Sequence, residues 1–376
     1  MLSERGPDPK EKTLRILCGE AAGMCQYEGC LERLFYDDVT ASNFNASYVA
    51  HIVASSSNGP RGCKDLSHVL SDQLSNLMLM CDRHHRLIDN NPEIYSAARL
   101  AEMKRSHQEK IGLLCELLYV PETEVVLFSS PIKGKAEVSI ETADANRAVL
   151  PTKKASSSHG RPLRIVSDYD YRSREYWEDA AQQLRNKAKV IEEIFFYNPS
   201  SHVSVFPFAP IPLIALLGEV LGDKLHLDVY QRYRDPDSWS WQSEEITNEI
   251  LVDSDTHPNP CSIAIVLALS SDISIQRIRA IKNYDSVYKI SFSRQDVDCI
   301  RSRQDLKIFW KTYLEILDQI KNEQKNVECV DLYPAIPVSA AFEIGRRHMP
   351  GVHLPVRIFD EDNGFFETLT IGDNNA

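Results

Sequence analysis

The pattern of hydrophobic and polar positions changes part-way along the chain. Up to about residue 120, apolar runs are short and are interrupted by Cys, His and Asn. The clearest helix in this part is predicted over residues 95–107, where apolar residues recur at helical spacing. Residues 122–140 have the apolar run and alternation of strands, and residues 150–163, rich in Ser, Lys and Pro, have the composition of a linker.

Beyond residue 163, apolar strand-like runs alternate with helical patterns, and no short internal repeat is visible. The strands are predicted at residues 201–206, 225–230, 261–269 and 328–332, and the helices at residues 211–221, 276–282 and 305–321. This alternation is typical of a mostly parallel, three-layer α/β arrangement. The chain is therefore predicted to be multidomain, with domains at residues 1–120 and 164–376 joined by a connecting strand and linker segment, residues 121–163.

Composition and charge narrow the class of protein. Hydrophobic residues make up 43% and charged residues 26%, as in globular proteins. No apolar run reaches the roughly 18 residues of a membrane span, and the charged start lacks the apolar core of a signal peptide. We therefore expect a cytoplasmic protein with no membrane partner. The net charge of −12 argues against coating of nucleic acid over the whole surface, but it allows a local basic patch.

The nine cysteines are an odd number without a secretory context, so a metal site is a better expectation than a disulfide framework. Four residues have the spacing of zinc ligands: Cys25 and Cys30 form C-x4-C, and Cys81 and His84 form C-x2-H. Two short pairs separated by a long insertion can hold one tetrahedral Zn²⁺. The alternative is two unrelated pairs.

The segment between these pairs carries a second ordered set of residues. His51 follows Ala50 in Ala-His-Ile, Asn76 lies in Ser-Asn-Leu, and His85 follows His84 in Cys-x-x-His-His-x-x-Ile-Asp. With the Gly-Pro-Arg turn that ends in Arg61, this order resembles the HNH nuclease family over roughly residues 15–107. The resemblance implies a ββα-metal fold, a β-hairpin followed by a helix, with one catalytic divalent metal.

In such a site His51 would be the general base, because a neutral imidazole can take a proton from water near neutral pH. His85 is the matched position for the catalytic ion, Mg²⁺ or Mn²⁺, which polarises the phosphoryl and leaving oxygens. By resemblance, Asn76 is mainly structural and ties the hairpin to the helix so that His51 points correctly. Arg61 is a candidate DNA phosphate contact, with a solvated surface arginine as the alternative.

One position departs from many HNH enzymes, which have an acidic metal ligand immediately before the first histidine. This chain has Ala50 there. The second protein ligand of the catalytic ion is therefore open, with Asp65, Asp89 or water as the possibilities. Because the subgroup with the Ala-His-Ile motif has alanine at this position too, the alanine does not indicate an inactive enzyme.

The second half contains no recognisable catalytic motif. Three of its stretches, residues 201–218, 229–241 and 333–347, resemble the SAVED family. That resemblance implies two fused Rossmann-like (CARF-like) halves that bind a cyclic di- or trinucleotide made by a bacterial synthase during phage infection. The whole chain then resembles an HNH–SAVED effector of bacterial cyclic-oligonucleotide-based antiphage signalling (CBASS).

Aromatic rings stack on bases and arginines pair with phosphates, so the candidate ligand-binding residues are of these types. They are Tyr230, Arg232, Arg234, Trp239, Trp241 and Arg346. The alternative for the two tryptophans is that they are core residues on one face of a strand. Pro210 and Pro212 open a predicted helix whose free N–H groups can meet a phosphate.

The function expected from these resemblances is a ligand-activated endonuclease. A cyclic oligonucleotide bound to the SAVED domain would drive assembly into a homo-oligomer, a dimer or tetramer, and the HNH domains would then cleave double-stranded DNA. The alternative is a DNA-binding regulator with a non-catalytic zinc HNH fold and a small-molecule sensor domain. The presence of His51, Asn76 and His85 argues against that alternative, because a structural zinc site has no use for them.

Overall fold

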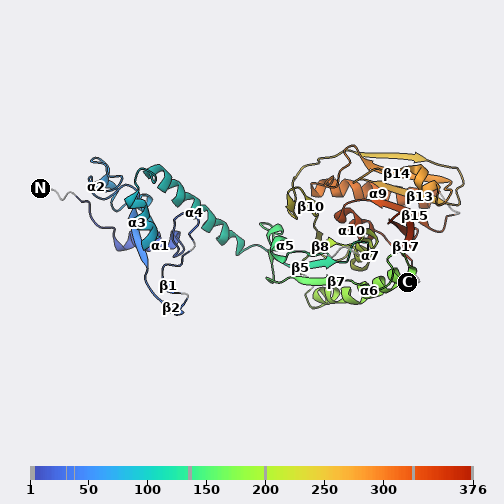
Figure 1. The fold of residues 1–376 in the computed structure, drawn as a ribbon, viewed down its shortest axis with the longest axis horizontal. Helices are drawn as coiled ribbons and strands as arrows, with labels where there is room; N and C mark the ends of the chain where they lie inside the picture. Colours follow the sequence, from blue (N-terminus) through green and yellow to red (C-terminus); the bar gives the residue numbers. More distant parts are fainter. Residues whose placement is uncertain are drawn as a thin grey trace. The chain divides into compact units, whose positions relative to one another are not determined.

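In the computed structural model the chain forms two units, Met1–Tyr119 and Val120–Ala376 (Figure 1). The described residues are 5–30, 32–37, 39–133, 138–198, 201–323 and 327–373. Within these ranges no helix has the length and hydropathy to cross a membrane.

The N-terminal unit is built from short elements around a small core. They are α1 (Glu11–Glu20), β1 (Tyr36–Asp37), β2 (Ser42–Asn43), β3 (Ser47–His51), α2 (Ser67–Leu70), the 3-10 turn η1 (Leu74–Asn76), β4 (Leu77–Cys81), α3 (Asp82–Asn90) and α4 (Ala97–Leu117). Strands β3 and β4 pair antiparallel, β4 is buried along its whole length, and α3 follows it without a loop. Ser96 caps α4 by accepting a hydrogen bond from the Arg99 backbone, so the helix predicted over residues 95–107 is present and extends further.

The second unit begins with a parallel sheet. Its elements are β5 (Glu122–Ser129), α5 (Thr142–Ala148), β6 (Lys154–Ala155), β7 (Arg161–Arg164), α6 (Arg174–Tyr197), β8 (Val203–Phe208), α7 (Ile211–Leu221) and β9 (Leu227–Val229). The strand order is β6-β5-β8-β9, and β7 also pairs with β5. The prediction of a linker at residues 150–163 is wrong, because β6 and β7 hydrogen-bond to β5. The strand expected at residues 122–140 ends at Ser129, and residues 134–137 lie outside the described ranges.

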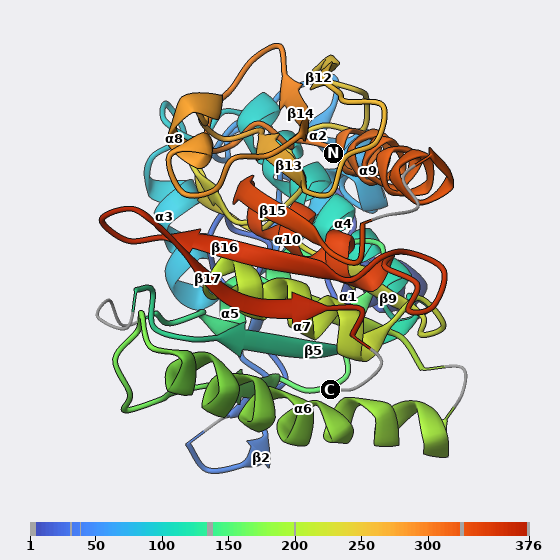
Figure 2. The same cartoon turned by 90° about the vertical axis from the view of Figure 1, so that its right-hand side faces the viewer.

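A second, mixed sheet follows. It comes after a separate two-stranded hairpin of β10 (Tyr233–Arg234) and β11 (Asp237–Ser238), and its elements are β12 (Ile250–Asp255), β13 (Ile263–Ala268), α8 (Ile275–Arg279), β14 (Ser286–Phe292), α9 (Arg303–Glu323), β15 (Val330–Ala335), α10 (Val338–Arg346), β16 (Val356–Glu361) and β17 (Phe365–Ile371). Strands β14, β13, β15 and β16 are parallel, and the edge strands β12 and β17 are antiparallel. Figure 2 shows β15, β16 and β17 side by side. The α/β prediction is confirmed for this unit.

The two sheets of this unit share one core at the crossing of α7 and α10. The helices approach so closely that a Cβ on Gly345 would lie 1.8 Å from the Ala215 carbonyl oxygen. A Cβ on Gly218 would lie 2.1 Å from the Phe342 carbonyl oxygen. Both distances are far inside van der Waals contact, so only glycine fits at either position. Each helix follows a strand of its own sheet, β8 or β15, and the crossing therefore brings the carboxyl ends of both strands together.

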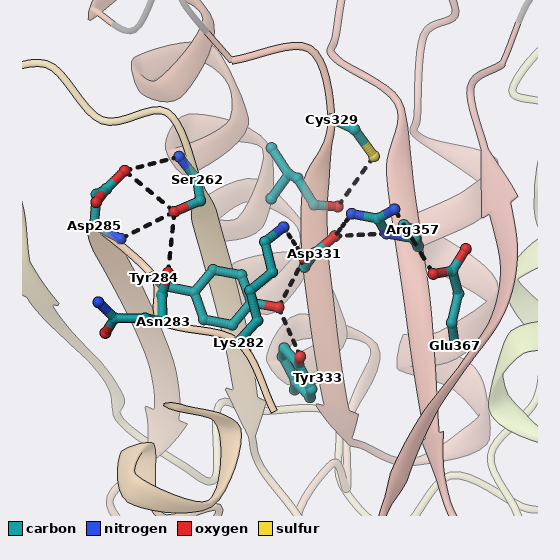
Figure 3. A network of polar contacts seen from close by, with 11 residues as sticks. Ser262, Lys282, Asn283, Tyr284, Asp285, Cys329, Asp331, Tyr333, Arg357 and Glu367 are labelled. Atoms are coloured by element: carbon teal, nitrogen blue, oxygen red, sulfur yellow. Dashed lines mark hydrogen bonds and ion pairs between the residues drawn. The ribbon is translucent and has the colours of Figure 1, made fainter. Parts of the chain in front are cut away.

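A buried carboxylate at the start of β15 links this strand to β16 and to the segment before β14 (Figure 3). Asp331 is 1% exposed and accepts hydrogen bonds from Tyr284, Lys282 and Arg357 at 2.7 to 2.9 Å. The Tyr284 hydroxyl is also 2.7 Å from the Tyr333 hydroxyl. A buried charge with this many donors is fully compensated. These hydrogen bonds therefore hold the sheet together where β15 begins.

Candidate functional sites

Four metal-type donors meet in the N-terminal unit. The ligand atoms of Cys25, Cys30, Cys81 and His84 all lie within 4.8 Å of one another. The Nδ1 atom of His84 is 3.2 Å from the Cys81 sulfur and 3.7 Å from the Cys25 sulfur. In a tetrahedral zinc site with bonds of about 2.0–2.3 Å these edges would be about 3.5 Å. The donors predicted from spacing are thus brought together at distances that fit one Zn²⁺.

The local fold explains this convergence. Cys81 ends β4 and lies just before α3, and His84 is in the first turn of α3. Cys25 and Cys30 lie in the turn after α1, where the backbone of Gln26 donates to Leu79 of β4. Burial raises the pKa of the Cys25 thiol to about 12, so a thiolate at this position requires a cation beside it. The ring of Tyr27 stacks on His84 at 4.0 Å and fixes the imidazole plane.

A separate cavity of about 270 Å³ collects the other predicted residues of this unit. Its lining includes His51 from β3, His85 and Asp89 from α3, and Arg61 from the loop between the strands. The Nε2 atom of His85 is 3.6 Å from a carboxylate oxygen of Asp89. Asp89 is therefore placed beside His85 as an oxygen donor, whereas Asp65 does not line this cavity.

The hydrogen bonds of His51 define its tautomer. Its Nε2 lies 3.1 Å from the carbonyl oxygen of Ser71, which can only accept, so Nε2 donates. In the neutral ring the lone pair is then on Nδ1. Burial lowers the pKa of His51, an effect that the hydrogen bond to Ser71 only partly offsets. The imidazole is therefore held neutral, with Nδ1 as its basic atom.

Asn76 fixes the loop that follows His51. Its side-chain oxygen accepts from the backbone N–H of Val53 at 2.8 Å. Its amide nitrogen donates to the carbonyls of Val53 and Leu70. Asn76 is 4% exposed, so these bonds are shielded from water. These bonds hold the Val53 backbone, two residues after His51, to the end of α2 at Leu70, and none of the three reaches α3, so the predicted tie from the hairpin to the helix is corrected to a tie within the segment between β3 and β4.

Arg61 has a different role from the predicted DNA contact. Its side chain is 5% exposed and donates to the carbonyls of Ile52, Ile88 and His51 and to the carboxylate of Asp89. The guanidinium is thus engaged within the protein and joins the loop after β3 to α3. Both interpretations of Arg61 from the sequence, a phosphate contact and a solvated surface arginine, are corrected, because the guanidinium N–H groups face inward.

The second unit has a cavity of about 500 Å³ where β8, β13 and β15 end. The first residues of α7 and α10, Ile211 and Val338, line it as well. In α/β sheets ligands bind outside the carboxyl ends of the strands, and helix N-termini there favour anions. The predicted helix at residues 211–221 thus begins at this cavity, whose charged lining residues are Arg232, Arg234, Asp237 and Asp298.

The predicted ligand-binding residues divide into two groups around this cavity. Arg232 and Arg234 line it. Tyr230 and Trp239, at 1% and 2% exposure, instead pack on Phe206 in a core cluster. The stacking role predicted for Tyr230 and Trp239 is therefore corrected to a core role, because Phe206 and its neighbours cover both rings.

Trp241 and Arg346 also lie outside the cavity lining. Trp241 packs against the core, with the guanidinium of Arg303 5.6 Å from its ring. Arg346 is 9% exposed, pairs with Glu343, and donates to the carbonyls of Gly222 and Leu225. Both are packing residues in this structure, which corrects the ligand-binding prediction for them.

Several cavity residues were missed at the level of sequence. They include Gln231, Ser270, Ser271 and Asp298. The carboxylate of Asp298 accepts from the backbone N–H groups of Arg234 and Asp235 and so orders the arginine-bearing loop. Ser270 and Ser271 directly follow a buried parallel strand, which is the position where polar residues signal a site. That signal was available in the sequence.

Comparison with protein families matches residues 183–371 to the model of SAVED, the "SMODS-associated and fused to various effectors sensor domain". The match covers both helices of the central crossing and the cavity at their N-termini. This chain belongs to the SAVED family. Its second unit is accordingly a SAVED sensor with α/β character, as the sequence resemblance implied. No curated protein matches the chain.

Among solved structures, the SAVED protein is similar to the Acinetobacter baumannii Cap4 SAVED/CARF-domain containing receptor with the cyclic trinucleotide 2'3'3'-cAAA. The identity is 12% and the TM-score 0.42, over 82% of this chain and 62% of the receptor. The Moraxella osloensis Cap4 receptor gives 11% identity and a TM-score of 0.41, over 76% of this chain and 60% of the receptor. The SAVED chain thus spans about 62% of the length of the first of these receptors.

Proposed function

We propose that this SAVED protein is a metal-dependent DNA endonuclease that a cyclic oligonucleotide activates in antiphage signalling. The N-terminal unit supplies the nuclease and the SAVED unit the sensor. The observation that carries the nuclease assignment is one cavity that contains His51, His85 and Asp89 beside the β3–β4–α3 hairpin and helix. The resemblance of the same residues to HNH nucleases supports it independently.

In this proposal Nδ1 of His51 takes the proton of a water molecule whose oxygen attacks the DNA phosphorus, and the bond to the leaving oxygen breaks. The low pKa of His51 keeps the imidazole ready to accept that proton at neutral pH. His85 and Asp89 would hold the Mg²⁺ or Mn²⁺, which supplies Lewis-acid stabilisation of the phosphoryl and leaving oxygens. Asp89 then provides the oxygen that Ala50 cannot.

The four-donor cluster of Cys25, Cys30, Cys81 and His84 would hold a structural Zn²⁺. It links the turn after α1 to the junction of β4 and α3, so it stabilises the helix that carries His85. A closed four-ligand site leaves no position for substrate, which separates the zinc from the chemistry. His84 and His85, adjacent in sequence, therefore serve different metals.

For the sensor we propose a cyclic di- or trinucleotide in the cavity at the start of α7 and α10. Family membership supports this ligand class, and the Cap4 receptor noted above was solved with a cyclic trinucleotide. Arg232 and Arg234 supply positive charge for phosphates at the cavity wall. Ligand binding would favour a homo-oligomer that brings nuclease units together on double-stranded DNA. For this to happen the ligand must bind the assembled state more tightly than the unassembled state, since it shifts the equilibrium only by that difference in affinity.

One experiment tests both halves of this proposal. The purified full-length protein is incubated with plasmid DNA, Mg²⁺ and a panel of cyclic di- and trinucleotides. Cleavage is expected with one or a few of them, and His51→Ala should abolish it while the fold is retained. Arg234→Ala should lose the cleavage that the ligand induces, whereas Arg174→Ala, which replaces an exposed arginine on α6, should behave as wild type. Cleavage by His51→Ala at the wild-type rate would overturn the assignment.

A further inference from the structure

The N-terminal segment of the chain packs beside the candidate nuclease site. Arg5 forms an antiparallel bridge with Ser56, and the backbone N–H of Gly6 donates to Ser55 at 2.8 Å. Gly6 is buried, and a Cβ there would lie 2.6 Å from the Ser71 hydroxyl oxygen and 3.1 Å from the His68 Cα. The segment is therefore seated closely against the residue whose carbonyl accepts from His51.

This seating brings a second arginine to the site. Arg5 lines the same cavity as His51, His85, Arg61 and Asp89. Its charge is close enough to His51 to lower the pKa of that imidazole, after the larger effect of burial. No sequence motif pointed to Arg5, because it is 46 residues from His51 along the chain.

The two arginines of the cavity differ in what their guanidinium groups contact. The side chain of Arg61 is 5% exposed and is bonded to three carbonyls and Asp89. The side chain of Arg5 is 64% exposed, and its ion pair with Asp8 at 3.0 Å joins two exposed groups. Surface ion pairs contribute little stability, so replacing the Asp8 pair with a pair to a phosphate would cost little.

We propose that Arg5 is the cation that binds the DNA phosphate in this site, in the role that sequence reasoning gave to Arg61. This inference rests on the proposed nuclease function. A phosphate in the cavity would face the guanidinium of Arg5, which can pair with two of its oxygens. Negative charge grows on those oxygens as water attacks, so the interaction strengthens in the transition state.

The test compares two exposed arginines of the same unit in the full-length protein. Arg5→Gln removes the proposed contact, and Arg15→Gln is the matched control, since Arg15 is also exposed and pairs with Glu11 at the surface. Single-turnover plasmid cleavage is measured at saturating Mg²⁺ with the nucleotide panel. We expect Arg5→Gln to lower the rate by about 10- to 100-fold and Arg5→Lys to recover part of it, while Arg15→Gln stays within about twofold.

A binding measurement separates this inference from the nuclease proposal. Affinity for a short fluorescein-labelled duplex is measured by anisotropy in His51→Ala protein, with and without Arg5→Gln, over a salt series. Loss of one phosphate contact should weaken binding and lower the salt slope by about 1. Equal rates and affinities for Arg5→Gln and Arg15→Gln would overturn the inference, as would no measurable duplex binding. If wild-type protein never cleaves, the nuclease proposal fails, and the anisotropy comparison alone decides whether Arg5 contacts DNA.

Discussion

Replacing Arg61 with alanine should destabilise the N-terminal unit rather than simply weaken DNA binding. The Arg61 guanidinium donates to the carbonyls of Ile88 at 2.7 Å, Ile52 at 2.9 Å and His51 at 3.3 Å. It also pairs with Asp89 at 2.7 Å. Alanine removes all of these donors at once and leaves the loop after β3 unconnected to α3.

The expected loss follows from these contacts. A hydrogen bond from a charged donor contributes about 1.5–3 kcal/mol, and the two short bonds to carbonyls carry most of this. The bond to His51 is longer, and the pair with Asp89 is discounted because the Asp89 side chain is 34% exposed. We therefore expect Arg61→Ala to lower the free energy of unfolding of this unit by about 3–5 kcal/mol.

Hydrogen exchange of the full-length protein measures this effect unit by unit. Peptides from residues 5–119 should lose protection by roughly a hundredfold or more, the equivalent of 3 kcal/mol, while peptides from the SAVED unit keep theirs. Arg86→Ala is the matched control, because Arg86 on α3 is 70% exposed and forms a surface ion pair with Asp82. Its effect should stay within about 0.5 kcal/mol.

A particular outcome would refute this reasoning. If Arg61→Ala keeps wild-type protection in residues 5–119 and loses only DNA cleavage, Arg61 is a phosphate contact and its inward bonds are dispensable. The same result would remove the main contrast between Arg61 and Arg5. Unfolding confined to the N-terminal unit supports the structural role.

Three further outcomes are expected. The single-turnover rate at saturating Mg²⁺ should stay level from pH 8 to about 6.5. Below the lowered pKa of His51 it should fall about tenfold per pH unit, because protonation removes the base. A fall that begins above pH 7 would contradict this prediction. Cys81→Ser should release zinc, measured by mass spectrometry of the metal, and unfold residues 5–119 while the SAVED unit still binds its nucleotide. Zinc-free wild-type protein with full hydrogen-exchange protection would contradict the prediction of a structural zinc site. Gly345→Ala should destabilise the SAVED unit by about 3 kcal/mol in chemical denaturation, because its Cβ cannot fit beside Ala215. Gly112→Ala, where a Cβ would have no heavy atom within 4 Å, should cost nothing. Equal denaturation midpoints for both variants would show that α7 and α10 can separate.

Features that depend on spacing and local pattern could be predicted from the sequence. The pairs Cys25–Cys30 and Cys81–His84 were recognisable because zinc ligands recur at such intervals. The helix at residues 211–221 was predicted with its true ends, since Pro210 and Pro212 mark its start and Gly222, at φ 64°, its end. Strand and helix alternation indicated the α/β class because it reports burial averaged over many residues.

Only the tertiary structure decided which side chains face a cavity. Trp239 and Arg232 are neighbours in one motif, yet Phe206 covers the tryptophan and leaves the arginine at the cavity wall. Partners of this kind come from distant parts of the chain, and no local pattern specifies them. The same holds for residues 150–163, whose composition suits a linker but whose strands pair with β5. Arg61 is buried and bonded within the protein for the same reason, since burial and hydrogen bonding are set by the residues that folding brings alongside.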